Sequence, residues 1–336
     1  MGDPQTLADF VTWAIQTYPA QHYALTISSH GAGWPGNGPD ETDGEDMLQF
    51  PEITAALQQA LGATGVDQLD IIGFDACLMG QIEVYQALAP YTRYVLASEE
   101  VIPGNGWEYV TPFSQLAANP GMSAEQFGTN IIDAYMAYYA GPGARTKVDL
   151  HLVDTSTIPA VLDALDVFAA AADQDMLDKL SALGVARINA QIFGAEAGDA
   201  LSTENNSAYF ASVDLVSLME LVGGQADIDP ALVDAAYAVS DAAQAAVVYG
   251  AADTYLPDAH GMAIYFPTNS LAASVPAANL NDLVPYADAL PDMSAWSGFL
   301  GTFHNTIDTA LTPDKLKITI TSVLPEGDTA SIYDPP

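Results

Sequence analysis

The sequence predicts an α/β protein with a mostly parallel central sheet that is covered by helices on both faces. Short runs rich in branched and aromatic residues alternate with longer stretches of helical periodicity, at the spacing of βαβ units. Glycine-rich or polar segments follow several of the strand-like runs, as is typical of loops at the carboxyl ends of strands. Half of the 336 residues are apolar, which suits one large globular domain or two modest ones.

The individual elements follow from hydrophobic periodicity, because helices repeat every 3.6 residues and half-buried strands every two. We expect strands at 23–29, 69–74, 94–100, 147–156 and 261–267. We expect helices at 5–18, around Leu57 and Leu61, and at 82–91, 123–139, 158–183 and 295–307. The stretch from about 184 to 252 is alanine-rich and largely helical, which predicts a helical insertion.

After Leu311 the pattern changes to strict alternation in KLKITITSVLP, which predicts the start of a β-rich C-terminal tail. We therefore divide the chain into a domain at 1–310 and a β-rich segment at 311–336.

The charge is strongly one-sided, with 7 Lys and Arg against 43 Asp and Glu and a net charge of −36. Such a field repels phosphates, so nucleic acid and anionic membrane surfaces are not expected partners. We interpret most of the charge as surface solvation, and we expect attraction of basic substrates only where acids line a cleft. No apolar run is long enough for a membrane span, and MGDPQTLADF does not have the pattern of a secretory signal.

Two strands end in a similar way, one at His30-Gly31 and the other at Asp75-Ala76-Cys77. The carboxyl ends of parallel strands share one rim of the sheet, so an imidazole and a thiol can meet there. Cysteine peptidases need this pair, because the imidazole deprotonates the thiol and then protonates the leaving amine. Glycine at position 31 allows close backbone approach, so the amides of Gly31 and Cys77 can form an oxyanion hole.

Each residue alone also fits a structural role. A lone cysteine is most often a small buried hydrophobe, and a lone histidine is most often a structural one. The joint pattern favours the catalytic interpretation, and we expect His22, His151, His260 and His304 to be structural.

Four ordered blocks, SSHGAGW, FDACLMG, ASEEVIPGNGWEY and HGMAIYFP, resemble the signature segments of the clostripain family of cysteine endopeptidases. The resemblance implies the caspase-like fold, His30 and Cys77 as the dyad, and cleavage after arginine or lysine with Asp75 in the S1 pocket. In caspases the histidine also precedes the cysteine, by about 50 residues. The resemblance further implies a secreted or cell-envelope bacterial protein, and calcium dependence in some relatives.

Asp75 can be assessed independently, because residues two apart on a strand point to the same side. It would then favour a basic side chain beside Cys77, although an Asp at this position can instead cap the following helix or orient the loop. Further S1 candidates are Glu99 and Glu100, which end the neighbouring strand, and the loop aromatics Trp34 and Trp107, which can equally be packed loop residues. The acidic residues between 40 and 46 do not have EF-hand spacing, so we expect no metal site and no required cofactor.

Two features depart from the family pattern. Members normally begin with an extra strand and helix, which we expect to be missing from the 1–310 domain. Members are often activated by cleavage at a basic residue between the histidine and the cysteine, and no Lys or Arg lies between His30 and Cys77. The nearest basic pair at which the chain could be cleaved is Arg145 and Lys147, in the loop AGPGARTK.

Together these observations predict a cysteine endopeptidase that cleaves protein substrates after Arg or Lys through His30 and Cys77. Two alternatives stay open, namely a non-catalytic caspase-like binding module and a peptidase with a non-basic preference.

Overall fold

The computed structural model describes residues 2–40, 46–141, 147–194, 211–226, 228–267 and 285–310. The predicted β-rich segment at 311–336, Arg145 and most of the acidic loop between 40 and 46 lie outside these residues.

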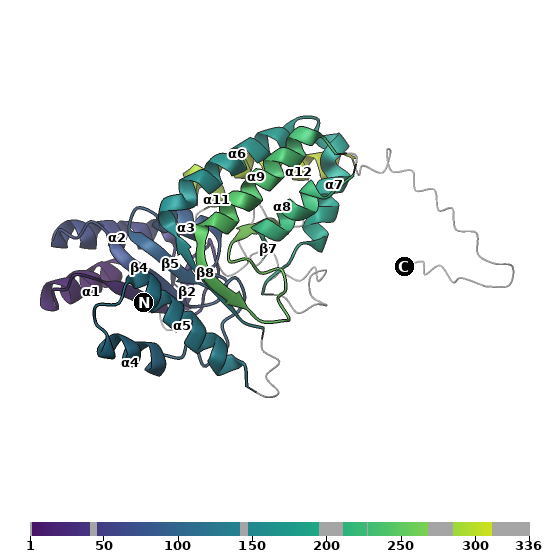
Figure 1. Cartoon of the computed structure of the whole chain (residues 1–336). Helices are drawn as coiled ribbons and strands as arrows, with labels where there is room; N and C mark the ends of the chain where they lie inside the picture. Colours follow the sequence, from purple (N-terminus) through teal and green to yellow (C-terminus); the bar gives the residue numbers. More distant parts are fainter. Residues whose placement is uncertain are drawn as a thin grey trace, which may run out of the picture.

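The central sheet contains five strands in the order β1–β4–β5–β6–β8. Their bounds are Ala24–Ser28 (β1), Leu69–Asp75 (β4), Thr92–Ala97 (β5), Asp149–Asp154 (β6) and Val247–Ala252 (β8). The pairs β1–β4 and β4–β5 are parallel, whereas β6 runs antiparallel to both β5 and β8. All strands of this sheet except β6 therefore point the same way, which confirms the predicted mostly parallel sheet (Figure 1).

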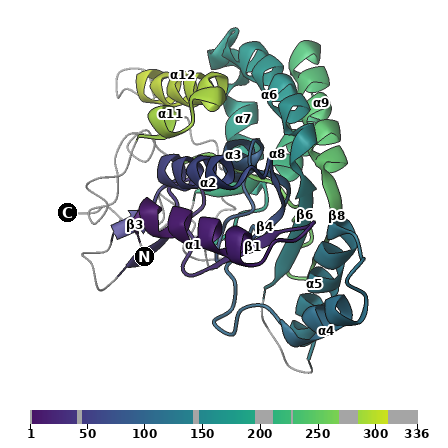
Figure 2. The same cartoon turned by 90° about the vertical axis from the view of Figure 1, so that its left-hand side faces the viewer.

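Alternating side chains of the sheet enter two separate cores, because successive residues of a strand point to opposite faces. Ile72 packs with helices α1 (Pro4–Thr17), α2 (Phe50–Thr64), α3 (Ile82–Leu88) and α6 (Ile158–Asp173). Its neighbour Ile71 packs on the other side with α5 (Ala124–Tyr139), which lies beside α4 (Val110–Ala118). Helices cover both faces of the sheet, as predicted (Figure 2).

The helix ends follow from local capping chemistry. The Asp3 side chain accepts a hydrogen bond from the backbone of Gln5 at the start of α1, and Ser123 does the same for Gln126 in α5. Gly65 ends α2 in the left-handed conformation, which glycine adopts without strain.

The predicted helical stretch at about 184 to 252 contains α8 (Leu215–Gly223) and α9 (Pro230–Ala246) among its described residues. These two helices form a layer with α6, α7 (Met176–Asn189) and α12 (Ser294–Ala310), seen at the top of Figure 1. The predicted single helix over 158–183 is wrong in detail, because it breaks before α7 at Asp175, which has a φ of 50°. Strand β8 was missed inside the alanine-rich stretch, since its sequence VVYGAA has no alternation that marks a strand.

The predicted strand at 261–267 exists as β9 (Ala263–Tyr265), but it lies outside the central sheet. It pairs antiparallel with β7 (Ser212–Asp214) in a sheet of two strands. A hairpin of β2 (Asn37–Asp40) and β3 (Asp46–Leu48) follows the first strand. The short remaining elements are η1 (Thr155–Thr157), α11 (Tyr286–Ala289) and η3 (Pro291–Met293).

One stretch, Thr155–Asp173, is long and apolar enough to cross a membrane by length and composition. In this structure it is a core helix, because Val161, Leu165 and Phe168 are buried in the main hydrophobic core.

Candidate active site

The strand register brings His30 and Cys77 to the same rim of the sheet. Ser28, the last residue of β1, pairs with Asp75, the last residue of β4. His30 and Cys77 each follow two residues later, so both loops leave the sheet at the same level. A β-carbon on Gly31 would lie 2.1 Å from the Cys77 carbonyl oxygen and 2.9 Å from its nitrogen. The two loops are therefore in direct backbone contact, and this contact requires glycine at position 31.

The turn after Cys77 is held in an uncommon conformation. Leu78 has a φ of 64°, which a residue with a branched side chain rarely adopts. Its backbone nitrogen donates to the Glu100 carbonyl at 3.2 Å, and that of Gly80 donates to the Ser98 carbonyl at 2.8 Å. These bonds fix the thiol-bearing turn against the end of β5, and such local strain is common at functional sites.

The Cys77 thiol is half-buried, and it lies 3.8 Å from the Ile102 carbonyl oxygen. Burial raises the pKa of the Cys77 thiol, and the charge of Glu100 adds to this, while backbone hydrogen bonds from Ile102, Gly31 and Cys77 itself act in the opposite direction. The thiol is thus protonated at neutral pH and needs a base to become a nucleophile.

His30 is exposed, and it directly precedes Gly31, the residue whose backbone contacts Cys77. Within the described part of the chain, no side chain is hydrogen-bonded to its imidazole. The ring can therefore turn toward the thiol, and no third residue that would orient it is identified among the described residues.

Asp75 lies at the bottom of this rim and is buried, with 7% of its surface exposed. Its Oδ2 atom accepts hydrogen bonds from the Tyr109 hydroxyl at 2.7 Å and from the Trp107 backbone nitrogen at 3.2 Å. Asp75 therefore does not cap the following helix, but its Oδ2 atom holds the loop that carries Trp107 and Tyr109, which is the loop-orienting half of the alternative. The Oδ1 atom of Asp75 remains buried without a hydrogen-bond partner.

The backbone of the loop that carries Tyr109 lies very close to the Asp75 side chain. Gly106 has a φ of 65°, and a β-carbon there would lie 2.6 Å from Asp75 Oδ2. The Trp107 ring covers Gly73, where a β-carbon would meet the ring at 2.8 Å. The Tyr139 hydroxyl holds the Gly106 carbonyl at 2.9 Å. Sequence reasoning missed Gly106 and Tyr109 as site residues, although both lie in the block ASEEVIPGNGWEY.

The two glutamates at the end of β5 lie in other surroundings. Glu99 is almost fully buried, and its Oε2 accepts from the Gly261 backbone at 2.7 Å. Burial, together with the nearby carboxylates of Asp214 and Asp149, raises the pKa of Glu99 well above its ordinary value. Glu100 accepts at Oε1 from the backbone nitrogens of Val101 and Gly194 at 2.9 Å each. The structure thus does not bring Glu99 or Glu100 into contact with Asp75.

The two candidate tryptophans also differ. Trp107 donates its backbone nitrogen to Asp75, while its ring covers Gly73 and is buried in the second core, with 4% of its surface exposed. Trp34 is 6% exposed and packs edge-on against Tyr265 and Tyr286, at ring distances of 5.4 and 5.1 Å. Trp34 is therefore a packed loop aromatic that belongs to the main core.

One group of described residues has the composition of a metal site. Ligand atoms of Glu99, Asp149 and His151 lie within 4.8 Å of one another, and all three residues are buried. Both Asp149 oxygens are already used, since Oδ1 accepts from Ser98 Oγ and the Glu100 nitrogen, and Oδ2 accepts from the Glu99 nitrogen. Calcium takes six to eight oxygen ligands, so this group does not fit it. Asp149 instead anchors the loop that supports the Cys77 turn.

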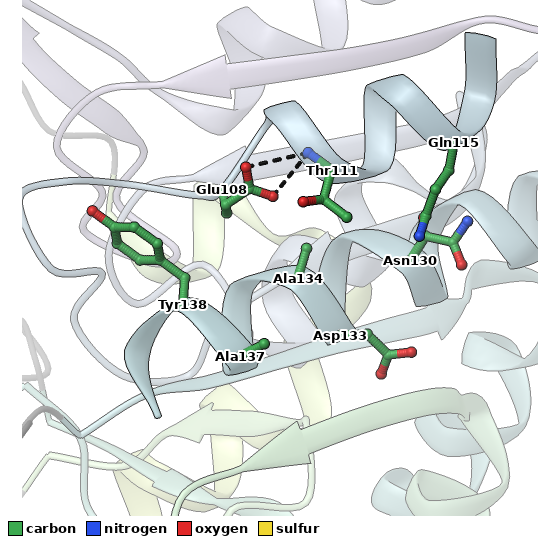
Figure 3. A pocket seen from close by; sticks show the side chains of 8 residues that line it. All are labelled: Glu108, Thr111, Gln115, Asn130, Asp133, Ala134, Ala137 and Tyr138. Carbon is green, nitrogen blue, oxygen red and sulfur yellow. Dashed lines mark hydrogen bonds between the residues drawn. The ribbon is translucent and has the colours of Figure 1, made fainter. Parts of the chain in front are cut away.

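A hollow of about 480 Å³ lies between α4 and α5 rather than at the thiol. Figure 3 shows its lining, which comprises Glu108, Thr111, Gln115, Asn130, Asp133, Ala134, Ala137 and Tyr138. The Glu108 carboxylate is occupied there, because it accepts from the backbone nitrogens of Val110 and Thr111 and caps α4. The hollow adjoins the Tyr109 loop through Glu108, but neither His30 nor Cys77 lines it.

Comparison with known proteins gives a consistent assignment. Residues 1–300 match the model of the clostripain family. Clostripain from Hathewaya histolytica is 29% identical over 144 residues, which are 37% of this chain and 26% of that protein. The chain thus aligns with about a quarter of the length of this curated relative.

Two solved structures share the fold. A secreted C11 cysteine protease from Bacteroides thetaiotaomicron, in complex with an irreversible peptide inhibitor, gives a TM-score of 0.59 at 21% identity, over 87% of this chain and 77% of that one. An inactive zymogen C11 protease from Parabacteroides distasonis gives 0.57 at 18% identity, over 91% and 76%. These likenesses confirm the caspase-like α/β fold.

Proposed function

Because this chain belongs to the clostripain family of cysteine peptidases, we propose that it is an endopeptidase that cleaves proteins after Arg or Lys through His30 and Cys77. The substrates would be protein or peptide chains that place a basic P1 side chain beside Asp75. The net charge of −36 favours the approach of basic segments over acidic ones.

In the proposed mechanism, His30 takes the proton of the Cys77 thiol as the sulfur attacks the scissile carbonyl carbon. The carbonyl oxygen gains negative charge, which the backbone N–H groups of Gly31 and Cys77 stabilise. His30 then returns the proton to the leaving amine, and the peptide bond breaks to give an acyl-enzyme. Water, deprotonated by His30, hydrolyses this thioester and restores the thiol.

The observation that carries the proposal is the contact between the two strand ends. Gly31 and Cys77 meet backbone to backbone, and both amides contribute hydrogen bonds that lower the pKa of the thiol. We assign the same two N–H groups to the oxyanion hole, because the oxyanion would develop beside the attacking sulfur. A binding module would have no need for two backbone amides directed at its single cysteine.

The preference for basic P1 residues is supported by the surroundings of Asp75. This buried carboxylate lies two residues before the nucleophile, and one of its oxygens has no hydrogen-bond partner. A buried carboxylate without a positive partner is costly, and a lysine or arginine side chain of a substrate would compensate it.

Two further proposals concern the location of the protein and its need for calcium. One relative of the same fold is described as secreted, and on that basis we propose that this chain acts outside the cytoplasm or at the cell envelope. The mechanism above uses no metal ion, and comparing peptidase activity with and without a calcium chelator tests the calcium dependence that the resemblance implies.

A Cys77→Ala variant tests the mechanism. We expect it to lose hydrolysis of Arg and Lys peptide amides while its thermal unfolding stays close to wild type. An alkylating peptide with a P1 arginine should label the wild-type chain once, and the site is unambiguous because the chain has one cysteine. Turnover that survives in Cys77→Ala would exclude the mechanism, and absence of labelling in reduced wild-type protein would favour the binding module. Cuts after neutral residues in a mixed peptide library would instead favour the non-basic peptidase.

A further inference from the structure

The two carboxylate oxygens of Asp75 have different surroundings. Oδ2 accepts two hydrogen bonds, from the Tyr109 hydroxyl at 2.7 Å and from the Trp107 nitrogen at 3.2 Å. Oδ1 is buried and has no partner. An oxygen with two donors has little remaining capacity as an acceptor, so Oδ1 is the oxygen of Asp75 that can still accept a hydrogen bond.

The Asp75 carboxylate also has no positively charged partner among the described residues. In the part of the chain that the structure describes, the ion pairs involve other carboxylates, and none includes Asp75. Since a buried carboxylate is stable only with compensation, the compensating cation is expected to come from the substrate. This step rests on the proposed function.

The donor that occupies Oδ2 is fixed in place. Burial and the Asp75 carboxylate raise the pKa of Tyr109, so its hydroxyl keeps its proton and remains a donor over the working pH range. The loop around it is held by the close approach of Gly106 to Asp75 and by the bond from Tyr139 to the Gly106 carbonyl. A ligand would therefore have to displace a well-placed hydroxyl to reach Oδ2.

We propose that Tyr109 determines the choice between lysine and arginine at P1 by occupying one oxygen of Asp75. A lysine ammonium is a compact charge that a single carboxylate oxygen can hold. An arginine guanidinium forms its strongest pairing with two oxygens at once, and Tyr109 prevents this. The wild-type pocket thus accepts lysine without penalty and holds arginine by one oxygen.

The variant Tyr109→Phe removes the hydroxyl and keeps the ring. We expect the ratio of kcat/KM for an Arg substrate to that for a matched Lys substrate to rise about tenfold, which corresponds to one charge-assisted hydrogen bond. Tyr249→Phe is the matched control, because it also removes a tyrosine hydroxyl that donates to a carboxylate, that of Asp133 at 2.7 Å, and it does not touch Asp75. Its Arg-to-Lys ratio should equal that of the wild type.

The outcomes separate this inference from the proposed function. If the wild-type chain cleaves after neither Arg nor Lys, the proposed function fails. If the wild type cleaves both and Tyr109→Phe lowers both rates equally, Tyr109 only supports Asp75 and the inference is overturned.

A measurement on the wild type keeps the inference testable if Tyr109→Phe does not fold. Butylamine and butylguanidine are compared as competitive inhibitors, since they differ only in the cationic group. We expect comparable inhibition constants, and a preference of tenfold or more for the guanidine would overturn the inference.

Discussion

The contact between Gly31 and Cys77 makes a sharp prediction for Gly31→Ala. A β-carbon at this position would lie 2.1 Å from the Cys77 carbonyl oxygen, 2.9 Å from the Cys77 nitrogen and 3.0 Å from the Met79 side chain. Two of these are backbone atoms, which cannot rotate away as the end of a side chain can. The His30 loop must therefore move away from the Cys77 turn.

The size of the effect follows from the geometry. Non-bonded atoms prefer separations of about 3.5 Å, so the two loops would separate by about 1 Å or more. A misplacement of about 1 Å costs roughly 10²-fold in rate, and the loss of one oxyanion donor costs about 10² to 10³. We expect kcat to fall by about 10² to 10³, with a loss of about 1–3 kcal/mol of unfolding free energy from overpacking.

Steady-state hydrolysis of a Lys or Arg peptide amide measures the rate, and thermal unfolding measures the stability. Gly62→Ala is the matched control, because Gly62 is exposed in helix α2 and a β-carbon there meets no atom within 4 Å. This control should keep full activity and gain up to about 1 kcal/mol in stability, since alanine is the better helix former. A Gly31→Ala variant that retains more than a third of the wild-type kcat/KM would refute the assigned contact between the two loops.

Two further predictions concern buried carboxylates. Asp75→Asn should keep the Tyr109 contact but lose the charge. We therefore expect kcat/KM to fall about 10²-fold or more for substrates with a basic P1 residue and to change little for a substrate with a neutral one. An equal loss of kcat/KM for both substrates would contradict the S1 role. Burial raises the pKa of Glu83 from 4.5 to about 7, with Tyr265 and Tyr286 donating to its Oε1. Because the folded state holds this proton more tightly than the unfolded chain, the contribution of Glu83 to stability is greatest below pH 4.5 and declines as the pH rises to about 7, by about 3 kcal/mol at most. Glu83→Gln should therefore unfold at a higher temperature than wild type at pH 8, and the difference in unfolding temperature should vanish near pH 4. An equal difference at the two pH values would show that the charge of Glu83 is not responsible.

The sequence by itself determined the elements and the two strand ends. Helix α1 and strand β4 follow from local periodicity and capping, which depend on neighbouring residues only. The positions of His30 and Cys77 after two parallel strands were predictable for the same reason, because parallel strands end at one rim. Strand β8 and the break before α7 were not, because neither has a local signal strong enough to override the alanine-rich helical pattern around it.

Only the tertiary structure decided which polar and aromatic residues accompany the thiol. Glu99 and Asp75 both stand at the ends of apolar strands, yet they have different hydrogen-bond donors. Glu99 accepts from the backbone of Gly261, a residue 162 positions away, and Asp75 accepts from the hydroxyl of Tyr109. Trp34 and Trp107 both follow glycine-rich loops, yet the Trp34 ring packs against Tyr265 in one core and the Trp107 ring covers Gly73 in the other. Periodicity indicates that a side chain leaves a strand end, but its partner depends on which distant loop closes over it. The Oδ1 atom of Asp75 is left without a partner because the loop that closes over it donates to Oδ2 only.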